Sequence, residues 1–360
     1  MKAIDKLHLV LSSSTGNTVI HTPYVRLLID QAESFGDFEI IDLSNESLVN
    51  RLNQLTPDEL CWFLMENKKS MFVYCEGKLD LLERIIAARH NSLCVYVARN
   101  KVFTGALLEK HPKMELFIWL LPKVIDYLSE MGVFNAGEYL KNQLVFGMCT
   151  ETHRDRAVLL NEQAMEAYMA LKNKTKKGKK TAILRLFSLL ALEATHTILF
   201  SEIAARIRTD NETAQRYVSL LEQSGYIYRL STYHSNQRYE FLKGNAIVFL
   251  DNGILNAHGV GFKELGHRND EEQLWRNWAI AELIKKGKVS GANNQYCFWQ
   301  SHTGQRIDLI IFSILKRPEA FVFTWNTKLK KKTSPLFNKY YPGIQVKQVT
   351  PLNYISVFNT

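Results

Sequence analysis

The stretch that most restricts the fold of this chain runs from Thr195 to Asp251. Apolar residues recur at helical spacing in Ser201–Ile207 and again in Glu212–Ser224. This spacing predicts two amphipathic helices. The short link between them carries Asp210 and Asn211, which are residue types that favour a helix N-terminus. The segment is therefore predicted to form two helices joined by a tight turn.

Two runs rich in β-branched and aromatic residues follow, at Tyr226–Leu230 and Arg238–Leu242, and a polar loop joins them. They predict a hairpin. Two helices, a short turn and a hairpin make up a winged helix-turn-helix, a frequent DNA-binding fold. The alternative is a structural winged helix that packs domains together.

In a DNA-binding winged helix, the outward face of the second helix would carry side chains that hydrogen-bond base edges or phosphates. The hairpin would add basic residues. The predicted DNA contacts are Thr213, Gln215, Arg216, Ser219, Arg229 and Arg238.

Composition sets broad limits on the rest. A chain of 360 residues predicts two or three domains. Hydrophobic residues at 46% and charged residues at 22% are typical of a globular protein. The formal net charge of +9 permits contact with nucleic acid, although part of it lies in the lysine-rich segments 174–180 and 328–332.

The five cysteines are scattered and form no metal-ligand pair, which favours a reducing compartment. The apolar run at Leu7–Leu11 is too short for a cleavable signal, and no apolar stretch approaches the length that spans a bilayer. We therefore expect a cytoplasmic protein with no membrane contact.

The first part of the chain alternates apolar strand-like runs with helical segments. The predicted strands are Leu7–Leu11, Phe38–Ile41, Met71–Cys75 and Leu93–Val97. Strands this apolar, separated by helices, are typical of a parallel α/β sheet covered on both faces.

A nucleotide phosphate loop would follow the first strand of such a sheet. Gly16 and Thr18 match the second glycine and the hydroxyl residue of that loop, but Leu11 replaces its first glycine and Asn17 its lysine. Loss of the lysine charge removes electrostatic stabilisation on which phosphoryl transfer depends.

The third predicted strand ends at Cys75-Glu76. Cys75 takes the place of the aspartate that would bind Mg²⁺, and sulfur is a poor Mg²⁺ ligand. Glu76 is kept in the position of a water-activating base. Together these changes predict that ATP hydrolysis is lost or weakened.

The order of segments resembles prokaryotic AAA-type ATPases that carry a C-terminal winged helix and a restriction-endonuclease-like domain. The matching motifs are Ser201-Glu-Ile-Ala, Arg216-Tyr-Val-Ser-Leu-Leu-Glu-Gln-Ser-Gly-Tyr-Ile and Phe249-Leu-Asp-Asn-Gly-Ile. The resemblance implies an α/β protein with a P-loop-like parallel-sheet domain at 1–172, a basic linker at 173–180, a winged helix at 181–262 and a nuclease-like α/β domain at 263–360.

The nuclease centre implied by the resemblance is depleted. Arg276 stands in the glutamate position, Asp308 is retained, and Phe323 and Trp325 replace the second acid and the lysine. One aspartate cannot hold the metal of a nuclease centre. The resemblance therefore predicts no cleavage, and Asp308 as a structural hydrogen-bonding residue rather than a metal ligand.

The sequence thus predicts a non-catalytic or weakened AAA-type ATPase homologue that regulates through DNA or protein binding by its winged helix, with no bound cofactor. Gly16, Asn17 and Thr18 are the remnant phosphate loop. One alternative is an ATP- and Mg²⁺-dependent enzyme that takes its lysine from elsewhere, such as Lys78 or a neighbouring subunit. The other is a purely structural interaction protein.

Overall fold

The computed structural model describes residues 18–22, 28, 38–43, 45–65, 70–74, 78–88, 94–98, 101–111, 115–118, 133–147, 180–233, 244–289, 293–313, 316–328 and 334–359. The chain divides into two compact units. Residues 1–121, together with the short segment 223–225, form the first, and residues 122–222 and 226–360 form the second.

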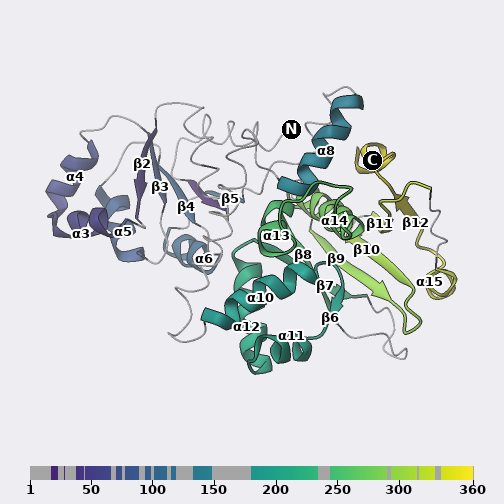
Figure 1. Ribbon diagram of the computed structural model, residues 1–360. Helices are drawn as coiled ribbons and strands as arrows, with labels where there is room; N and C mark the ends of the chain where they lie inside the picture. The colour runs from purple at the N-terminus through teal and green to yellow at the C-terminus, as the bar shows by residue number, and fades with distance from the viewer. Residues whose placement is uncertain are drawn as a thin grey trace. The chain divides into compact units, whose positions relative to one another are not determined.

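A five-stranded sheet forms the centre of the first unit, in purple and blue in Figure 1. Its strands are all parallel, in the order β2-β3-β4-β1-β5. Their bounds are β1 Thr18–His21, β2 Phe38–Asp42, β3 Ser70–Tyr74, β4 Cys94–Ala98 and β5 Glu115–Ile118.

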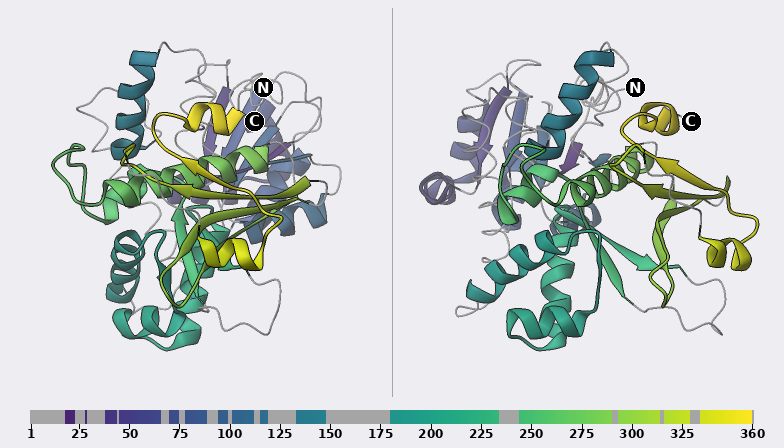
Figure 2. Two further views of the ribbon diagram at one scale, coloured as in Figure 1. Left: turned by 90° about the vertical axis from the view of Figure 1, so that its right-hand side faces the viewer. Right: turned by 45° about the vertical axis from the view of Figure 1, so that its right-hand side comes forward.

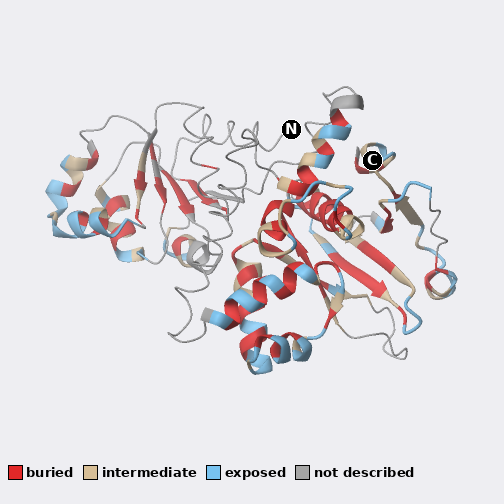
Figure 3. Ribbon diagram, viewed as in Figure 1, coloured by how far each residue is buried: buried red, intermediate tan, exposed pale blue. Residues whose placement is uncertain are grey.

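The described helices of the first unit are α3 Glu46–Gln54, α4 Pro57–Met65, α5 Leu79–Ala88 and α6 Lys101–Lys110. Their apolar faces share one core with the sheet, which includes Val19, Val73 and Tyr96 from the strands and Leu52 and Leu82 from the helices. A parallel sheet with buried apolar strands is confirmed (Figure 3).

Strand β1 lies in a segment that the sequence did not predict as a strand. Thr18 was expected in the phosphate loop, but it is the first residue of β1, with Val95 and Glu115 as its Cα partners. Three successive β-branched or apolar residues in Thr18-Val-Ile suit a strand better than a loop. The expected strand Leu7–Leu11 lies outside the described residues.

The second unit is built on a seven-stranded sheet in the order β12-β11-β10-β9-β7-β8-β6. The strands are β6 Thr197–Ile198, β7 Ile227–Thr232, β8 Asn245–Phe249, β9 Asn294–Gln300, β10 Arg306–Ser313, β11 Lys316–Phe323 and β12 Val346–Val349. The described helices are α8 Val133–Phe146, α10 Lys180–Leu192, α11 Phe200–Ile207, α12 Asn211–Gln223, α13 Asn252–His258, α14 Glu271–Val289, α15 Pro335–Tyr340 and α16 Tyr354–Asn359.

Helices α10, α11 and α12 lie together at one end of this unit (Figures 1 and 2). The turn between α11 and α12 is short because Arg208 adopts a left-handed backbone at φ 59° and ends α11. Asp210 then accepts hydrogen bonds from the backbone N–H and the hydroxyl of Thr213, which caps α12. The predicted helix-turn-helix geometry therefore forms locally.

The hairpin differs from the expected one. Strand β7 pairs antiparallel with β8, and β6 pairs with the other edge of β8. The expected second strand, Arg238–Leu242, lies outside the described residues. Among the described residues, the antiparallel partner of β7 is therefore β8, which lies after the expected second strand.

The expected boundary at 262/263 does not separate two sheets. Strand β7 also pairs in parallel with β9, where Ser231 lies opposite Cys297 and Thr232 opposite Phe298. Strands β6 to β8 and the C-terminal strands β9 to β12 thus form one continuous sheet. A sheet that shares backbone hydrogen bonds across a boundary makes the two parts one structural unit.

Helix α8 also crosses an expected boundary. The side-chain amide of Asn256 donates to the carbonyls of Leu144 and Val145, and that of Asn252 donates to Leu144. These bonds satisfy carbonyls at the end of α8. The helix therefore belongs to the second unit rather than to a domain that ends at residue 172.

Candidate functional sites in the second unit

The surface of α12 is the first candidate site. Gln215 and Arg216 are exposed and Ser219 is half-buried, as expected of residues that face a ligand. Thr213 is different, because it is 6% exposed and both its backbone N–H and its hydroxyl donate to Asp210. Thr213 therefore has a structural contact, because its backbone N–H and hydroxyl donate to the capping carboxylate of Asp210, and its contact with DNA stays a prediction.

Arg216 has no carboxylate partner among the described residues, and its guanidinium lies 5.7 Å from the ring centre of Tyr217. Arg208 in the turn is also exposed and was missed by the sequence analysis. An arginine in a turn next to a predicted helix start is a signal that could have found it. Together these side chains give α12 and the turn before it a polar face whose donors have no hydrogen-bond partner among the described residues.

Arg229 contributes less than expected. Its guanidinium is 3.4 Å from the carboxylate of Glu222 and 5.8 Å from the ring centre of Phe200. The backbone N–H of Arg229 also donates to Glu222. This arginine is therefore largely engaged within the fold. Arg238 lies outside the described residues.

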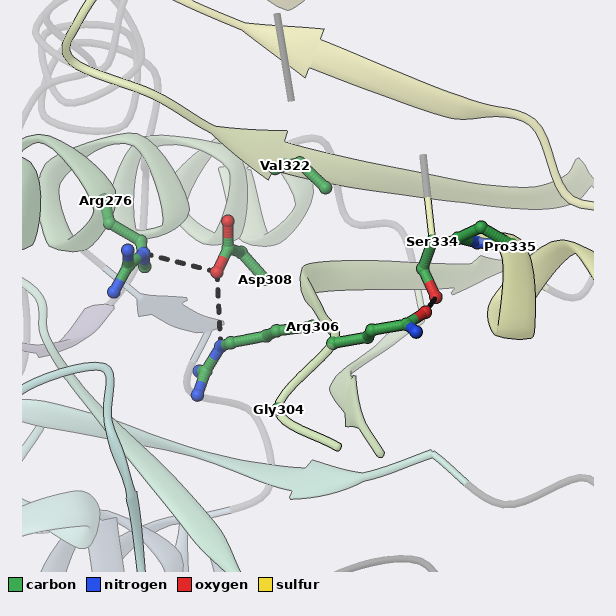
Figure 4. A pocket seen from close by; sticks show the side chains of 8 residues that line it. Arg276, Gly304, Arg306, Asp308, Val322, Ser334 and Pro335 are labelled. Atoms are coloured by element: carbon green, nitrogen blue, oxygen red, sulfur yellow. Dashed lines mark hydrogen bonds and ion pairs between the residues drawn. The ribbon is translucent and has the colours of Figure 1, made fainter. Parts of the chain in front are cut away.

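The second candidate site is a cavity of about 400 Å³ at the edge of strands β10 and β11 (Figure 4). It combines two arginines and one carboxylate with small and polar residues. Its lining comprises Arg276, Gly304, Gln305, Arg306, Asp308, Val322, Ser334 and Pro335.

Asp308 is the centre of this second site, with its side chain 3% exposed. Oδ1 lies 3.2 Å from Nε of Arg276 and accepts a 3.2 Å hydrogen bond from Nε of Arg306. Oδ2 accepts a 2.9 Å hydrogen bond from the backbone N–H of Phe323. Buried carboxylates need such partners because desolvation of an unpaired charge is costly. The expected role of Asp308 as a hydrogen-bonding residue agrees with these contacts.

Arg306 lies two residues before Asp308, so both side chains lie on one face of β10. Its Nη1 donates to Thr197 and Gln300, its Nη2 donates to the carbonyl of Thr195, and its guanidinium stacks 4.8 Å from the ring centre of Phe298. Burial is the main cause that lowers the pKa of Arg306; Asp308 opposes it, the nearby charge of Arg276 adds to it, and the net pKa is about 10.

Two positions of the implied nuclease centre lie beside Asp308, and the third does not. Arg276, in the glutamate position, and the backbone of Phe323, in the acid position, both contact Asp308. The backbone N–H of Trp325, in the lysine position, donates to Glu272 instead. The guanidinium groups of Arg276 and Arg306 therefore lie beside the one retained carboxylate. Their two positive charges would repel a metal cation at this position. Within the described residues, no group of three His, Cys, Asp or Glu side chains could hold a metal.

The topology of the first unit locates where a ligand of its sheet would bind. The connection from β1 leads to the edge strand β2, whereas that from β4 leads to the opposite edge strand β5. Ligands of open α/β sheets bind at the carboxyl ends of strands where such connections diverge. That point follows His21 and Ala98. Thr18 lies at the other, amino end of β1. The other residues of the expected phosphate loop, Gly16 and Asn17, and also Glu76, lie outside the described residues.

One protein-family model matches part of the chain, and the function of that family is unknown. Residues 154–266 match a family described as a domain of unknown function, DUF8612. The match covers α10 to α13 and thus the helix-turn-helix. No curated protein matches the chain. Among the described residues, no helix has the length and apolar character needed to cross a membrane.

Proposed function

We propose that the protein is a non-catalytic homologue of the AAA-type ATPases that acts as a regulator by binding duplex DNA through α12. The observation that supports this is the exposed face of α12, where Gln215 and Arg216 have no side-chain hydrogen bond or ion-pair partner among the described residues. Arginine and glutamine are well suited to bind phosphates and base edges. The positive end of the helix dipole adds attraction for phosphate at the start of α12.

The chemistry of the flanking regions supports a non-catalytic role. Asp308 is bonded to two arginines and a backbone N–H, so its oxygens are already engaged. The ATPase-like motifs lack the lysine at Asn17 and the metal-binding aspartate at Cys75. A protein with these changes keeps a binding surface but lacks the charges that hydrolysis requires.

A salt titration of DNA binding tests this function. A fluorescent duplex is titrated with the protein, and anisotropy is measured over a range of salt concentrations. Contact with several phosphates predicts an affinity that falls steeply as salt rises. Arg216→Ala should weaken binding by about tenfold and reduce the salt slope by about one.

Arg317→Ala is the matched control, because Arg317 is also exposed but lies on β11. It should leave both affinity and slope nearly unchanged. Equal losses in the two variants would show only non-specific attraction to a basic protein. No binding at low salt would instead favour the structural interaction protein.

A further inference from the structure

The cavity beside Asp308 differs in one respect from a structural ion-pair network: one of its arginines is poorly satisfied. Arg276 is a side chain of α14 with 12% of its surface exposed. A guanidinium carries five N–H donors. Its only hydrogen bond to a described residue is from Nη1 to the hydroxyl of Thr195, at the limiting distance of 3.5 Å.

The carboxylates near Arg276 do not use its remaining donors well. Nε lies 3.2 Å from Asp308 but is not aligned for a hydrogen bond. Nη2 is 3.8 Å from Glu272, whose side chain is 39% exposed. Buried polar groups are nearly always hydrogen-bonded in folded proteins. A guanidinium that lines a cavity, with a buried Nε that has no hydrogen-bond partner among the described residues, is therefore a feature that calls for a ligand.

The charge balance of the cavity selects an anion. Arg276 and Arg306 supply two positive charges, and Asp308, the one acid among the described lining residues, neutralises one of them. In the described part of the chain, the only other carboxylate within salt-bridge distance of either arginine is the partly exposed Glu272. His196 on the adjacent segment adds no fixed charge of its own, since burial and the two arginines lower its pKa. The described lining thus carries a net positive charge on two largely buried arginine side chains, and each charge acts more strongly there than in open water.

The volume of the cavity and the chemistry of its lining residues indicate which kind of anion it could bind. A volume of about 400 Å³ lies within the range of small-molecule sites. Gln305 and Ser334 are polar groups in the wall, although the Ser334 hydroxyl already donates to Gln305 and accepts from Phe337. The planar fork of arginine pairs in a bidentate manner with phosphate oxygens.

We propose that this cavity binds a phosphate group, with Arg276 as its principal ligand and Arg306 as the second positive charge. The fixed guanidinium of Arg276 thereby takes the place that a metal ion would need beside Asp308. The same phosphate chemistry is offered by free phosphate, by a nucleoside monophosphate and by a nucleic-acid end. Binding here does not depend on the proposed contact of α12 with DNA.

Isothermal titration calorimetry on the full chain tests the site. Sodium phosphate is titrated into the protein, with sodium chloride at the same ionic strength as the reference. Adenosine monophosphate and a duplex oligonucleotide with or without a 5′-phosphate are then compared. Phosphate should bind and chloride should not; the probe that binds tightest identifies the source of the phosphate.

Substitutions that should weaken phosphate binding, and one that should strengthen it, make the test specific. Arg276→Gln should weaken phosphate binding about tenfold or more, because a charged hydrogen bond is lost. Arg276→Lys, which keeps the charge but loses the fork, should give a smaller loss. Asp308→Asn should strengthen binding, because it removes the competing negative charge. Arg317→Gln, on an exposed arginine of β11, is the matched control and should change nothing.

Circular dichroism of each variant confirms that it is folded. Arg276→Gln leaves Asp308 bonded to Arg306 and Phe323, so this variant is expected to fold. The site is refuted if no phosphate-bearing probe binds, or if Arg276→Gln and wild type bind phosphate equally. Arg216→Ala should keep full phosphate affinity, so failure of this site and failure of DNA binding by α12 are distinguishable.

Discussion

Two arginine-bearing regions of the second unit differ in how their charges are supported. On α12, Arg216 is exposed and has no carboxylate partner among the described residues. In the cavity, Arg276 and Arg306 are largely buried and share the carboxylate of Asp308. An exposed arginine is hydrated at little cost and stays available to a partner, whereas a buried one contributes to the fold because its counter-charge is built in.

Removal of the buried counter-charge should give the largest effect. Asp308→Ala leaves two buried guanidinium groups without their shared carboxylate and the backbone N–H of Phe323 without its acceptor. We expect a loss of about 3–5 kcal/mol in the free energy of unfolding. Urea denaturation followed by circular dichroism measures it.

The contrast with the exposed arginine completes this experiment. Arg216→Ala should change the free energy of unfolding by less than about 0.5 kcal/mol, as is usual for a surface substitution. Comparable losses in Asp308→Ala and Arg216→Ala would mean that burial does not distinguish the two regions.

A smaller effect should distinguish the capping contact at the start of α12 from the residues of α12 that are proposed to contact DNA. Thr213→Ala removes the hydroxyl that donates to Asp210 at the helix start, which should cost about 1 kcal/mol of stability. Thr213→Ser keeps the hydroxyl and should recover most of that loss. Thermal unfolding measures the stability of both variants. DNA affinity of folded Thr213→Ala should match wild type, and a loss as large as that of Arg216→Ala would instead support Thr213 as a DNA contact.

The smallest expected effect is a pH dependence of stability that comes from His196. Burial, followed by the charges of Arg276 and Arg306, lowers the pKa of His196 in the folded protein. A depressed pKa means that the unfolded chain binds the proton more readily than the folded protein does. Stability should therefore fall as pH drops below the ordinary histidine pKa of about 6.5.

His196→Gln removes this titration. The difference in melting temperature between wild type and His196→Gln should depend on pH below about 6.5 and be constant above it. Thermal unfolding of both proteins at several values between about pH 5 and pH 8 measures this difference. A difference that is the same at every pH would contradict the proposed influence of the two arginines.

Much of the local structure could be predicted from the sequence. The spacing of Ile203, Ala204 and Ile207 predicted α11, and these three side chains are buried. The apolar runs at β2, β3 and β4 were also found as strands, because their residues are apolar on both faces. Strand β1 was missed: at four residues it is too short to give a clear periodic pattern, and its place depends on pairing with β4 and β5.

In the cavity beside Asp308 too, the sequence indicated some of the residues and missed others. The sequence singled out Arg276 and Asp308, and the structure brings them within 3.2 Å. It did not indicate Arg306, although an arginine two residues before a buried aspartate lies on the same strand face. Nor did it indicate Thr195, which adopts φ 64° and bonds both arginines. Its partners lie 81 and 111 residues away.

The sequence by itself determined the elements that depend on neighbours a few residues apart: helices, caps and apolar strands. Only the tertiary structure decided that β7 joins β9 in one sheet, and that Arg276 and Arg306 meet at Asp308. The physical reason is that local propensity and periodicity act over one or two turns of chain. Strand pairing and shared charge instead depend on which distant segments the fold brings together.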